Sequence, residues 1–355
     1  MNVAGKPYRT VWMEGNTVRI INQLRLPHFF ELMDLPDHQA TAKAIRTMAI
    51  RGAGAIGGAG GYGMAQVVLE APESSDFMKF ILKGAETLRK TRPTAQNLFY
   101  AIDRVVKRVE KIGSVKQAKK AAVEEAVAIA DEDASSCEMI GKIGADLIKD
   151  GMRIMTHCNA GWLAFVDWGT ALAPVYFAKR QGKKVFVFAD ETRPRNQGSS
   201  LTAWELMNEG VDFAILADNA SGIMMKRGEI DLVITGSDRI ASSGDTANKI
   251  GTYEKAVLAH ENGIPFYIAA PTSTIDPNCA SGDDIPIEER SQDEVLYAYG
   301  LKENGEYGRV RIAPRGAKAR NPAFDVTPGK YIHGIITQNG IFPPKRILES
   351  IKDSK

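Results

Sequence analysis

The chain has 355 residues, of which 44% are apolar and 25% are charged, a profile typical of a globular protein with room for two domains. The formal net charge is only +2, and basic and acidic residues are interspersed, which argues against nucleic-acid binding through bulk electrostatics. No segment reaches the roughly 18 consecutive apolar residues that a membrane span needs.

The first part of the chain has a mainly helical pattern. Residues 10–22 alternate enough to predict short strands in a small antiparallel sheet. From Thr41 to about Asp133 the apolar residues recur mostly at helical spacing, and residues 114–131 are rich in Ala, Lys and Glu. We therefore predict a mixed, mainly helical domain over residues 1–125 and a bridging helix over residues 126–150.

From Met152 onward the pattern changes to strands that alternate with helices. Strands are predicted at residues 153–156, 184–189, 212–217, 231–235, 265–270 and 330–337. Helices are predicted between most of them, at residues 162–180, 201–209, 222–227 and 247–261. This alternation is typical of the α/β fold class, and it predicts a doubly wound parallel sheet over residues 151–355.

Polar clusters follow five of these strands at their carboxyl ends. The clusters are residues 157–159, 190–193, 218–219, 237–239 and 271–274. In open α/β sheets, ligands bind outside the carboxyl ends of the strands. We therefore expect these clusters to meet in space and form one site.

The glycine-rich stretch from Arg51 to Gly63 is a candidate anion site, because seven of the twelve residues after Arg51 are glycine. It contains G-x-G-x-x-G, but the preceding residues look helical rather than strand-like, which argues against a dinucleotide fingerprint. Glycines let backbone N–H groups approach an anion, and Arg51 adds charge. The alternative is a close-packed helix–loop junction without a ligand.

Cys158 lies two residues after the first predicted strand of the α/β region, next to His157. A thiol at the mouth of a sheet can act as a base or nucleophile, although a lone cysteine there is often a small buried apolar residue. A dyad with His157 is not expected, because adjacent residues on a strand point to opposite faces.

Asp238 follows the fourth strand and could serve as a general acid–base if it is semi-enclosed. The alternative is a structural ion pair with Arg239. Further along, Asp245 is predicted to cap a helix whose first turn carries Asn248 and Lys249, which suits a phosphate or sugar hydroxyls. A simple cap with a solvated lysine is the alternative.

Two more polar candidates, Arg92 and Gln197, lie in short proline-containing loops. The three cysteines are widely spaced and form no Cys-x-x-Cys, and the five histidines form no His-Glu-x-x-His. We therefore expect no disulfide framework and no protein-held metal. Residues 1–12 have no apolar run that would predict a signal peptide, so a cytoplasmic location is expected.

Nine ordered blocks together resemble the methylthioribose-1-phosphate isomerase family. The resemblance runs from about Trp12 to the C-terminus, through RGAGAIG, TRPTAQNL, THCNAGWLA, DETRPRNQG-SSLTAWEL, GSDRI-ASSGDTANKIGTY, FYIAAPTSTID, IPIEER, RIAP and NPAFDVTP. It implies a Rossmann-like C-terminal domain, a homodimer, no cofactor, and conversion of 5-methylthioribose 1-phosphate to 5-methylthioribulose 1-phosphate in methionine salvage.

The resemblance also implies roles for individual residues. Cys158 and Asp238 match the family's catalytic pair. The substrate and phosphate binders are matched by Arg51, Gly52, Ala53, Arg92, Gln197, Asn248 and Lys249. Asp238 would protonate the ring oxygen, and the hydrogen on C2 would reach C1 either as a proton through Cys158 or as a hydride.

The chain departs from the family pattern at several positions. Gly54 replaces the usual proline, Ser237 replaces an alanine, Ser200 replaces an arginine, and the segment 296–310 is enlarged, as a lid or a subunit contact would be. Two other sugar phosphates, ribose 1,5-bisphosphate and 5-deoxyribose 1-phosphate, remain alternative substrates. A regulatory subunit of an initiation-factor exchange complex is the non-enzymatic alternative.

Overall fold

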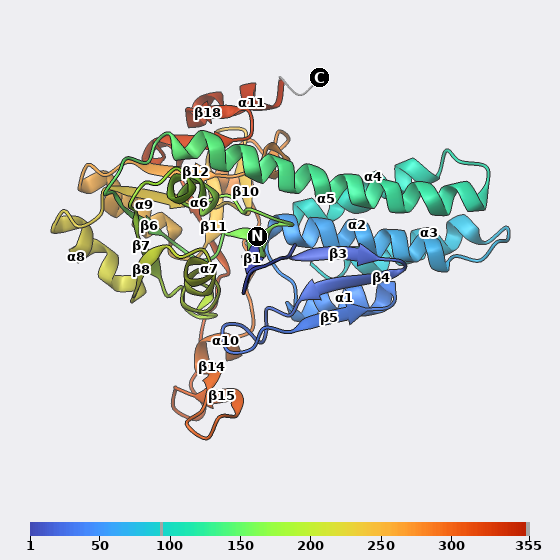
Figure 1. Cartoon of the computed structure of the whole chain (residues 1–355), viewed down its shortest axis with the longest axis horizontal. Coiled ribbons are helices and arrows are strands. Elements are labelled where there is room, and N and C mark those ends of the chain that lie inside the picture. The colour runs from blue at the N-terminus through green and yellow to red at the C-terminus, as the bar shows by residue number, and fades with distance from the viewer. Residues whose placement is uncertain (93–94, 353–355) are drawn as a thin grey trace.

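The N-terminal lobe packs helices against a small antiparallel sheet in a computed structural model that describes residues 1–92 and 95–352. Its strands are β1 (Asn2–Val3), β2 (Lys6–Pro7), β3 (Val11–Glu14), β4 (Thr17–Ile21) and β5 (Leu32–Leu35), and β3, β4 and β5 form the sheet. Its helices are α1 (His38–Thr47), α2 (Ala53–Glu70), α3 (Phe77–Arg89), α4 (Gln96–Val109) and α5 (Val115–Ala145). The predicted strands and helices of this region are confirmed (Figure 1).

The glycine-rich stretch is helical, because its residues from Ala53 onward form the first turns of α2. This helix is buried on nearly all sides, so neighbouring elements approach its backbone closely. A Cβ atom added at Gly60 would lie 2.6 Å from Leu98 Cδ1, and one at Gly54 would lie 2.3 Å from Asp133 Oδ1. Tertiary packing therefore outweighs the poor helix propensity of glycine.

Helix α5 is continuous from Val115 to Ala145 and runs along both lobes (Figure 1). The position 125, where the first predicted domain ends, lies inside this helix. Its second half packs on α6 (Ala173–Arg180), where Gly141 and Gly144 leave room for Phe177 and Pro174. The helix thus joins the core of one lobe to the core of the other.

The C-terminal lobe is built on a sheet in the order β18-β17-β12-β9-β6-β7-β8. Its strands are β6 (Arg153–Thr156), β7 (Phe186–Asp190), β8 (Asp212–Leu216), β9 (Leu232–Thr235), β12 (Phe266–Ala269), β17 (Gly334–Thr337) and β18 (Gly340–Phe342). All neighbours pair in parallel except β17 and β18. The predicted doubly wound, Rossmann-like sheet is confirmed, and its strand order reverses between β6 and β9.

Helices cover this sheet, but two predicted helices are shorter than the sequence pattern indicates. The covering helices are α6, α7 (Ala203–Asn208), α8 (Ser221–Lys226), α9 (Thr252–Glu261) and α11 (Glu349–Lys352). Residues 165–172, predicted as helix, form an irregular connection before α6. Residues 246–249, also predicted largely as helix, form a strand.

A second, smaller sheet lies beyond the carboxyl end of β9. It has the order β13-β10-β11-β16, with strands β10 (Arg239–Ala241), β11 (Thr246–Lys249), β13 (Ile275–Asp276) and β16 (Phe324–Thr327). After the short helix α10 (Asp293–Leu296), the hairpin of β14 (Tyr297–Leu301) and β15 (Tyr307–Arg311) protrudes from the body (Figure 1). This hairpin is the enlarged segment of the sequence.

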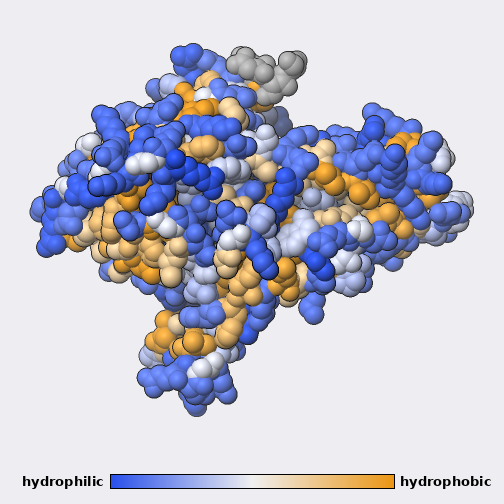
Figure 2. All heavy atoms as spheres, in the orientation of Figure 1, coloured by the Kyte–Doolittle hydropathy of each residue, from blue (hydrophilic) through white to orange (hydrophobic). Residues whose placement is uncertain are grey.

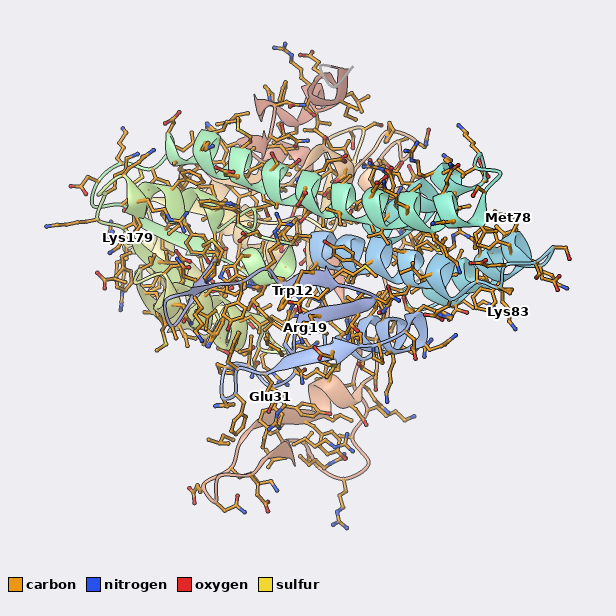
Figure 3. The ribbon with its side chains drawn as sticks, turned by 45° about the vertical axis from the view of Figure 1, so that its right-hand side comes forward. Trp12, Arg19, Glu31, Met78, Lys83 and Lys179 are labelled. Carbon is orange, nitrogen blue, oxygen red and sulfur yellow. The ribbon has the colours of Figure 1, made fainter. Side chains whose placement is uncertain are left out.

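Polar residues cover much of the face in Figure 2, and apolar residues also reach the surface on the hairpin, where Leu301, Val310 and Ile312 are exposed. Figure 3 shows Trp12 and Arg19 on the N-terminal sheet, with Glu31 nearer the hairpin. Within the described residues, no helix combines the length and apolar character needed to cross a membrane.

Candidate active site

Cys158 is held at the end of β6 by three neighbours. Its backbone adopts a left-handed conformation with φ of 65°. Its N–H donates to Thr192 Oγ1 at 2.8 Å, and its carbonyl accepts from Thr202 Oγ1 at 2.7 Å. The thiol donates to Gln197 Oε1 at 3.3 Å. A non-glycine residue in this backbone region is strained, so these bonds fix where the thiol points.

Asp238 lies just beyond β9, where the main sheet passes into the smaller one. Its N–H donates to the carbonyl of Ala247 at 2.9 Å, which ties it to β11. The alternative pairing with Arg239 does not describe this site, because Arg239 Nη2 lies 2.8 Å from Asp276 Oδ2 instead. The Asp238 carboxyl lines the same cavity as Cys158.

Both residues therefore lie at the point where the strand order of the sheet reverses. Cys158 follows β6 and Asp238 follows β9, and these two strands are neighbours whose connections leave on opposite sides. A cavity at such a switch point is the usual ligand site of an open α/β sheet. The polar clusters after β6 and β9 line this cavity, as predicted. The prediction that all five clusters form one site is wrong, because residues 190–193, 218–219 and 271–274 do not line it.

The nine residues proposed from the sequence for catalysis or substrate binding all line this one cavity. They are Arg51, Gly52, Ala53, Arg92, Cys158, Gln197, Asp238, Asn248 and Lys249. The N-terminal lobe contributes the first four, so the cavity lies between the lobes. Gly52 ends the turn before α2 with φ of 94°, and a Cβ atom there would lie 2.4 Å from Ala164 Cα. Only glycine fits this close approach.

Three cationic side chains reach the cavity from different directions. Arg51 is buried, and it donates to Asn159 Oδ1 at 2.6 Å and to the Asn159 carbonyl at 3.0 Å. Lys249 Nζ donates to the carbonyl of Ala323 at 3.0 Å and lies 4.8 Å from the centre of the Phe324 ring. Arg92 Nη2 lies 3.8 Å from Glu288 Oε2.

Asn248 and Lys249 reach the site from strand β11, which corrects the prediction that they occupy the first turn of a helix. Asn248 Nδ2 donates to Thr252 Oγ1 at 3.0 Å. Asp245 does not cap a helix; its carboxylate accepts from the N–H groups of Gly329 at 2.8 Å and Gly282 at 3.0 Å. The strand arises because β11 pairs with β16 as well as β10.

Burial shifts the ionisation of the central groups. It raises the pKa of the Cys158 thiol, although the charges of Arg51 and Lys249 act in the opposite direction. It also raises the pKa of Asp238 above the ordinary aspartate value, against the charges of Lys249, Arg51 and Arg92. Burial lowers the pKa of Lys249. Burial in this cavity thus favours a neutral thiol and disfavours extra positive charge, which an anionic ligand would compensate.

The sequence assigns no individual role to two supporting residues, Asn159 and Glu205. Asn159 accepts two hydrogen bonds from Arg51, and its own Nδ2 donates to Glu205 Oε1 at 2.8 Å. Glu205 is fully buried and also accepts from Tyr176 Oη at 2.7 Å and Trp162 N at 2.8 Å. Asn159 adjoins Cys158 in a polar cluster that the sequence did mark, whereas nothing in the LTAWEL block marks Glu205.

Arg290 is a further cation in the cavity lining that the sequence left unassigned. It lies in the IPIEER block, and its guanidinium donates to Glu294 Oε2 at 3.0 Å and Oε1 at 2.6 Å. A carboxylate thus already neutralises Arg290, which distinguishes it from Arg51.

His157, Asp190 and Asp218 offer donor atoms close enough to one another to hold a metal. However, each of these groups has protein partners. His157 Nδ1 lies 2.9 Å from Asp190 Oδ2, and its Nε2 lies 2.8 Å from the carbonyl of Ile250. Lys255 Nζ, 3.5 Å from Asp190 Oδ2, already supplies a cation there. We therefore interpret the cluster as structural: Asp190 of β7 links His157, which follows β6, to Lys255 of α9.

Fold and sequence comparisons place the chain in a defined class. It matches the model of the initiation factor 2 subunit family over residues 49–344. Its structure resembles that of translation initiation factor eIF-2B subunit delta from A. fulgidus, with a TM-score of 0.84, 39% identity, and coverage of 98% of this chain and 100% of that one. The chain belongs to the initiation factor 2 subunit family.

Within that class the comparisons are more specific. The methylthioribose-1-phosphate isomerase of Gluconobacter oxydans is 48% identical, over 96% of this chain and 95% of the relative. The crystal structure of 5-methylthioribose 1-phosphate isomerase from Pyrococcus horikoshii has a TM-score of 0.87 and 43% identity, and the match covers 99% of this chain and 97% of that one. The chain belongs to the methylthioribose-1-phosphate isomerase family, which confirms the resemblance seen in the sequence.

Proposed function

We propose that this chain is a cytoplasmic isomerase that converts 5-methylthioribose 1-phosphate to 5-methylthioribulose 1-phosphate in methionine salvage. One observation carries the proposal: a thiol, a carboxyl and three cationic side chains from distant parts of the chain line a single cavity at the switch point of the sheet. The relatives at 48% and 43% identity are methylthioribose-1-phosphate isomerases, which supports this substrate.

The phosphate on C1 is assigned to Arg51, Arg92 and Lys249. Gly52 and Ala53 at the N-terminus of α2 line the same cavity, and unpaired backbone N–H groups there favour an anion. A bound phosphate would also restore the charge balance that burial of Lys249 and Arg51 disturbs. Asn248 and Gln197 are then the groups available to the sugar hydroxyls.

Ring opening is assigned to Asp238. The ordinary aldehyde route is blocked, because the anomeric oxygen is esterified by phosphate. Asp238 in its acid form gives a proton to the ring oxygen as the bond from that oxygen to C1 breaks. The raised pKa of Asp238 supports an acid of this kind. The carboxylate then takes the proton of the C2 hydroxyl as the C2 carbonyl forms, which restores the acid.

The hydrogen on C2 must reach C1 in the same step or the next. Burial raises the pKa of Cys158, so its thiol is a poor base before substrate binds. This supports direct hydride transfer from C2 to C1, with Cys158 forming a wall of low polarity beside the two carbons. Transfer as a proton through the Cys158 thiolate is the alternative.

Two observations bear on the rival functions. Ribose 1,5-bisphosphate needs a second phosphate site, and the nearby cation Arg195 is already bound to Glu294 Oε1 at 3.0 Å. A purely regulatory subunit has no need for a thiol and a carboxyl facing one cavity. The structural likeness to eIF2B beta of Chaetomium thermophilum, at 14% identity and a TM-score of 0.57, concerns the fold alone.

We also propose a homodimer as the working form. The proposed cytoplasmic location is a separate point. It is supported by Cys137, Cys158 and Cys279, which are buried and free, as is usual in a reducing compartment. Light scattering coupled to size-exclusion chromatography would test the dimer.

An activity panel tests the proposed function. The purified chain should turn over 5-methylthioribose 1-phosphate, and ribose 1,5-bisphosphate should be a much poorer substrate. Absence of turnover with every ribose 1-phosphate derivative would refute the enzymatic proposal and favour the regulatory subunit.

A further inference from the structure

A second cavity of about 590 Å³ adjoins the candidate active site, whose own volume is about 90 Å³. The two share Met48, Arg51 and Gln197 as walls. The second cavity alone falls within the range of roughly 300–1,000 Å³ that is typical of whole small-molecule pockets. A ligand in the active site therefore has a large adjoining space into which it can extend.

Gln197 stands at the junction of the two cavities. Its Oε1 accepts the Cys158 thiol at 3.3 Å, so one side of Gln197 faces the proposed reaction centre. The same residue lines the second cavity together with its neighbours Ser199 and Ser200. A group attached to the reacting sugar and directed past Gln197 would enter the second cavity.

Apolar and aromatic side chains make up much of the second cavity's wall. Leu24, Leu26 and Pro27 come from the connection between β4 and β5, and Leu201 comes from the turn before α7. The hairpin completes the wall with Tyr299 and Tyr307. Aliphatic groups and tyrosine rings suit a thioether, because sulfur makes favourable contacts with aromatic rings.

Protein contacts hold Tyr307, one of the two tyrosines of this wall, in place. The ring of His28 lies 6.0 Å from that of Tyr307, and the guanidinium carbon of Arg25 lies 5.4 Å from the same ring. Arg25 is itself paired with Glu31 at 3.1 Å. Figure 3 shows Glu31 in the segment of chain that lies near the hairpin. The cavity is therefore preformed, which reduces the entropy cost of filling it.

Two arginines near the second cavity are already paired with a carboxylate. Arg195 and Arg290 both bond the carboxylate of Glu294, at 3.0 Å and 2.6 Å. A charged ligand group entering here would have to compete with these pairs, whereas an uncharged group would leave them intact.

We infer that the second cavity receives the substituent on C5 of the sugar, and that it admits uncharged thioethers much larger than methylthio, aromatic ones included. This inference rests on the proposed function, because the phosphate and the reacting carbons must occupy the first cavity. It identifies Ser200 and Tyr299 as residues that set the size and character of the accepted substituent.

The test compares three substrates with the full-length chain: 5-deoxyribose 1-phosphate, 5-methylthioribose 1-phosphate and 5-benzylthioribose 1-phosphate. The benzylthio compound should be turned over with a kcat/KM within about tenfold of the methylthio compound. Ser200→Trp should fill the cavity and lower the ratio of benzylthio to deoxy kcat/KM by about tenfold or more.

Two further variants complete the test: a second change in the cavity wall and a control outside it. Tyr299→Ala removes an exposed aromatic wall with little effect on folding, since Tyr299 is 56% exposed, and it should also lower that ratio. Met207→Trp places the same new side chain on a surface site of α7 that is 69% exposed, outside both cavities, and it should leave the ratio unchanged.

The outcomes separate the two proposals. If the wild-type chain turns over the methylthio compound normally but not the benzylthio compound, the inference is overturned and the isomerase proposal still stands. Equal ratios in the wild-type chain, Ser200→Trp and Tyr299→Ala would also overturn it, because the substituent would then lie elsewhere. Failure of all three substrates would overturn the proposed function itself.

Discussion

The guanidinium of Arg51 donates to Asn159 twice, at 2.6 Å to Oδ1 and at 3.0 Å to the carbonyl oxygen. This pair of bonds joins the turn before α2 to the loop after β6, and so fixes one lobe against the other at the mouth of the cavity. The geometry requires a planar, forked donor.

Arg51→Lys should therefore raise KM for the sugar phosphate by about tenfold or more, because lysine keeps the charge but cannot make both bonds to Asn159. Steady-state kinetics measure this. Arg320→Lys, at an exposed ion pair with Glu289, is the matched control and should leave KM unchanged. An unaltered KM in Arg51→Lys would show that the forked pair of bonds to Asn159 is not needed for substrate binding.

The acid role of Asp238 predicts a specific pH dependence. Because the acid form is the active one, kcat should fall as the pH rises through the pKa of Asp238, which lies above its ordinary value. Glu288 contributes to that raised pKa, so Glu288→Gln should move the fall to lower pH by up to about one unit. The neighbouring Glu289→Gln should not move it. An identical profile in all three proteins would contradict the assignment.

Glu205 predicts how stability depends on pH. Burial raises its pKa from 4.5 to about 7, so the folded chain holds this proton more tightly than the unfolded chain does. Its contribution to the free energy of unfolding is full below pH 4.5 and is lost as the pH rises through about 7.

Glu205→Gln should therefore flatten this part of the stability profile, measured by urea unfolding between acid and neutral pH. At low pH the variant should differ little from the wild-type chain, because the amide and the protonated carboxyl each combine one acceptor oxygen with a donor group. A variant with the wild-type pH profile would show that Glu205 does not titrate in this range.

The neutral thiol of Cys158 predicts the fate of the transferred hydrogen. If the hydrogen moves as a hydride, product formed in deuterated water should carry no solvent deuterium at C1. Mass spectrometry or proton NMR of the product measures this. Deuterium at C1 would instead establish proton transfer and assign the base role to Cys158.

Much of the C-terminal lobe could be predicted, because buried parallel strands such as β6 and β9 leave continuous apolar runs in the sequence. The polar residues after them, Cys158 and Asp238, could be found for the same reason. Lys249 lines the cavity from a strand and not from the predicted helix. Pairing with β10 and β16 makes this segment a strand although its sequence has no apolar alternation.

The remaining features depend on contacts that no local pattern records. The glycines of α2 have poor helix propensity, and this segment is helical because the surrounding elements pack closely against it. Glu205 gains its role from Asn159, which is 46 residues away. The sequence indicates the hairpin only as an enlarged segment. That its Tyr299 and Tyr307 line a cavity follows from the three-dimensional structure alone.

The most direct test of the account is the variant Asp238→Asn, which preserves shape and removes the acid. The account predicts that turnover of 5-methylthioribose 1-phosphate is lost, while the dissociation constant measured by calorimetry stays within about threefold of the wild-type value. Retention of most of the activity would contradict the claim that a carboxyl after β9 and a thiol after β6 act on one sugar phosphate.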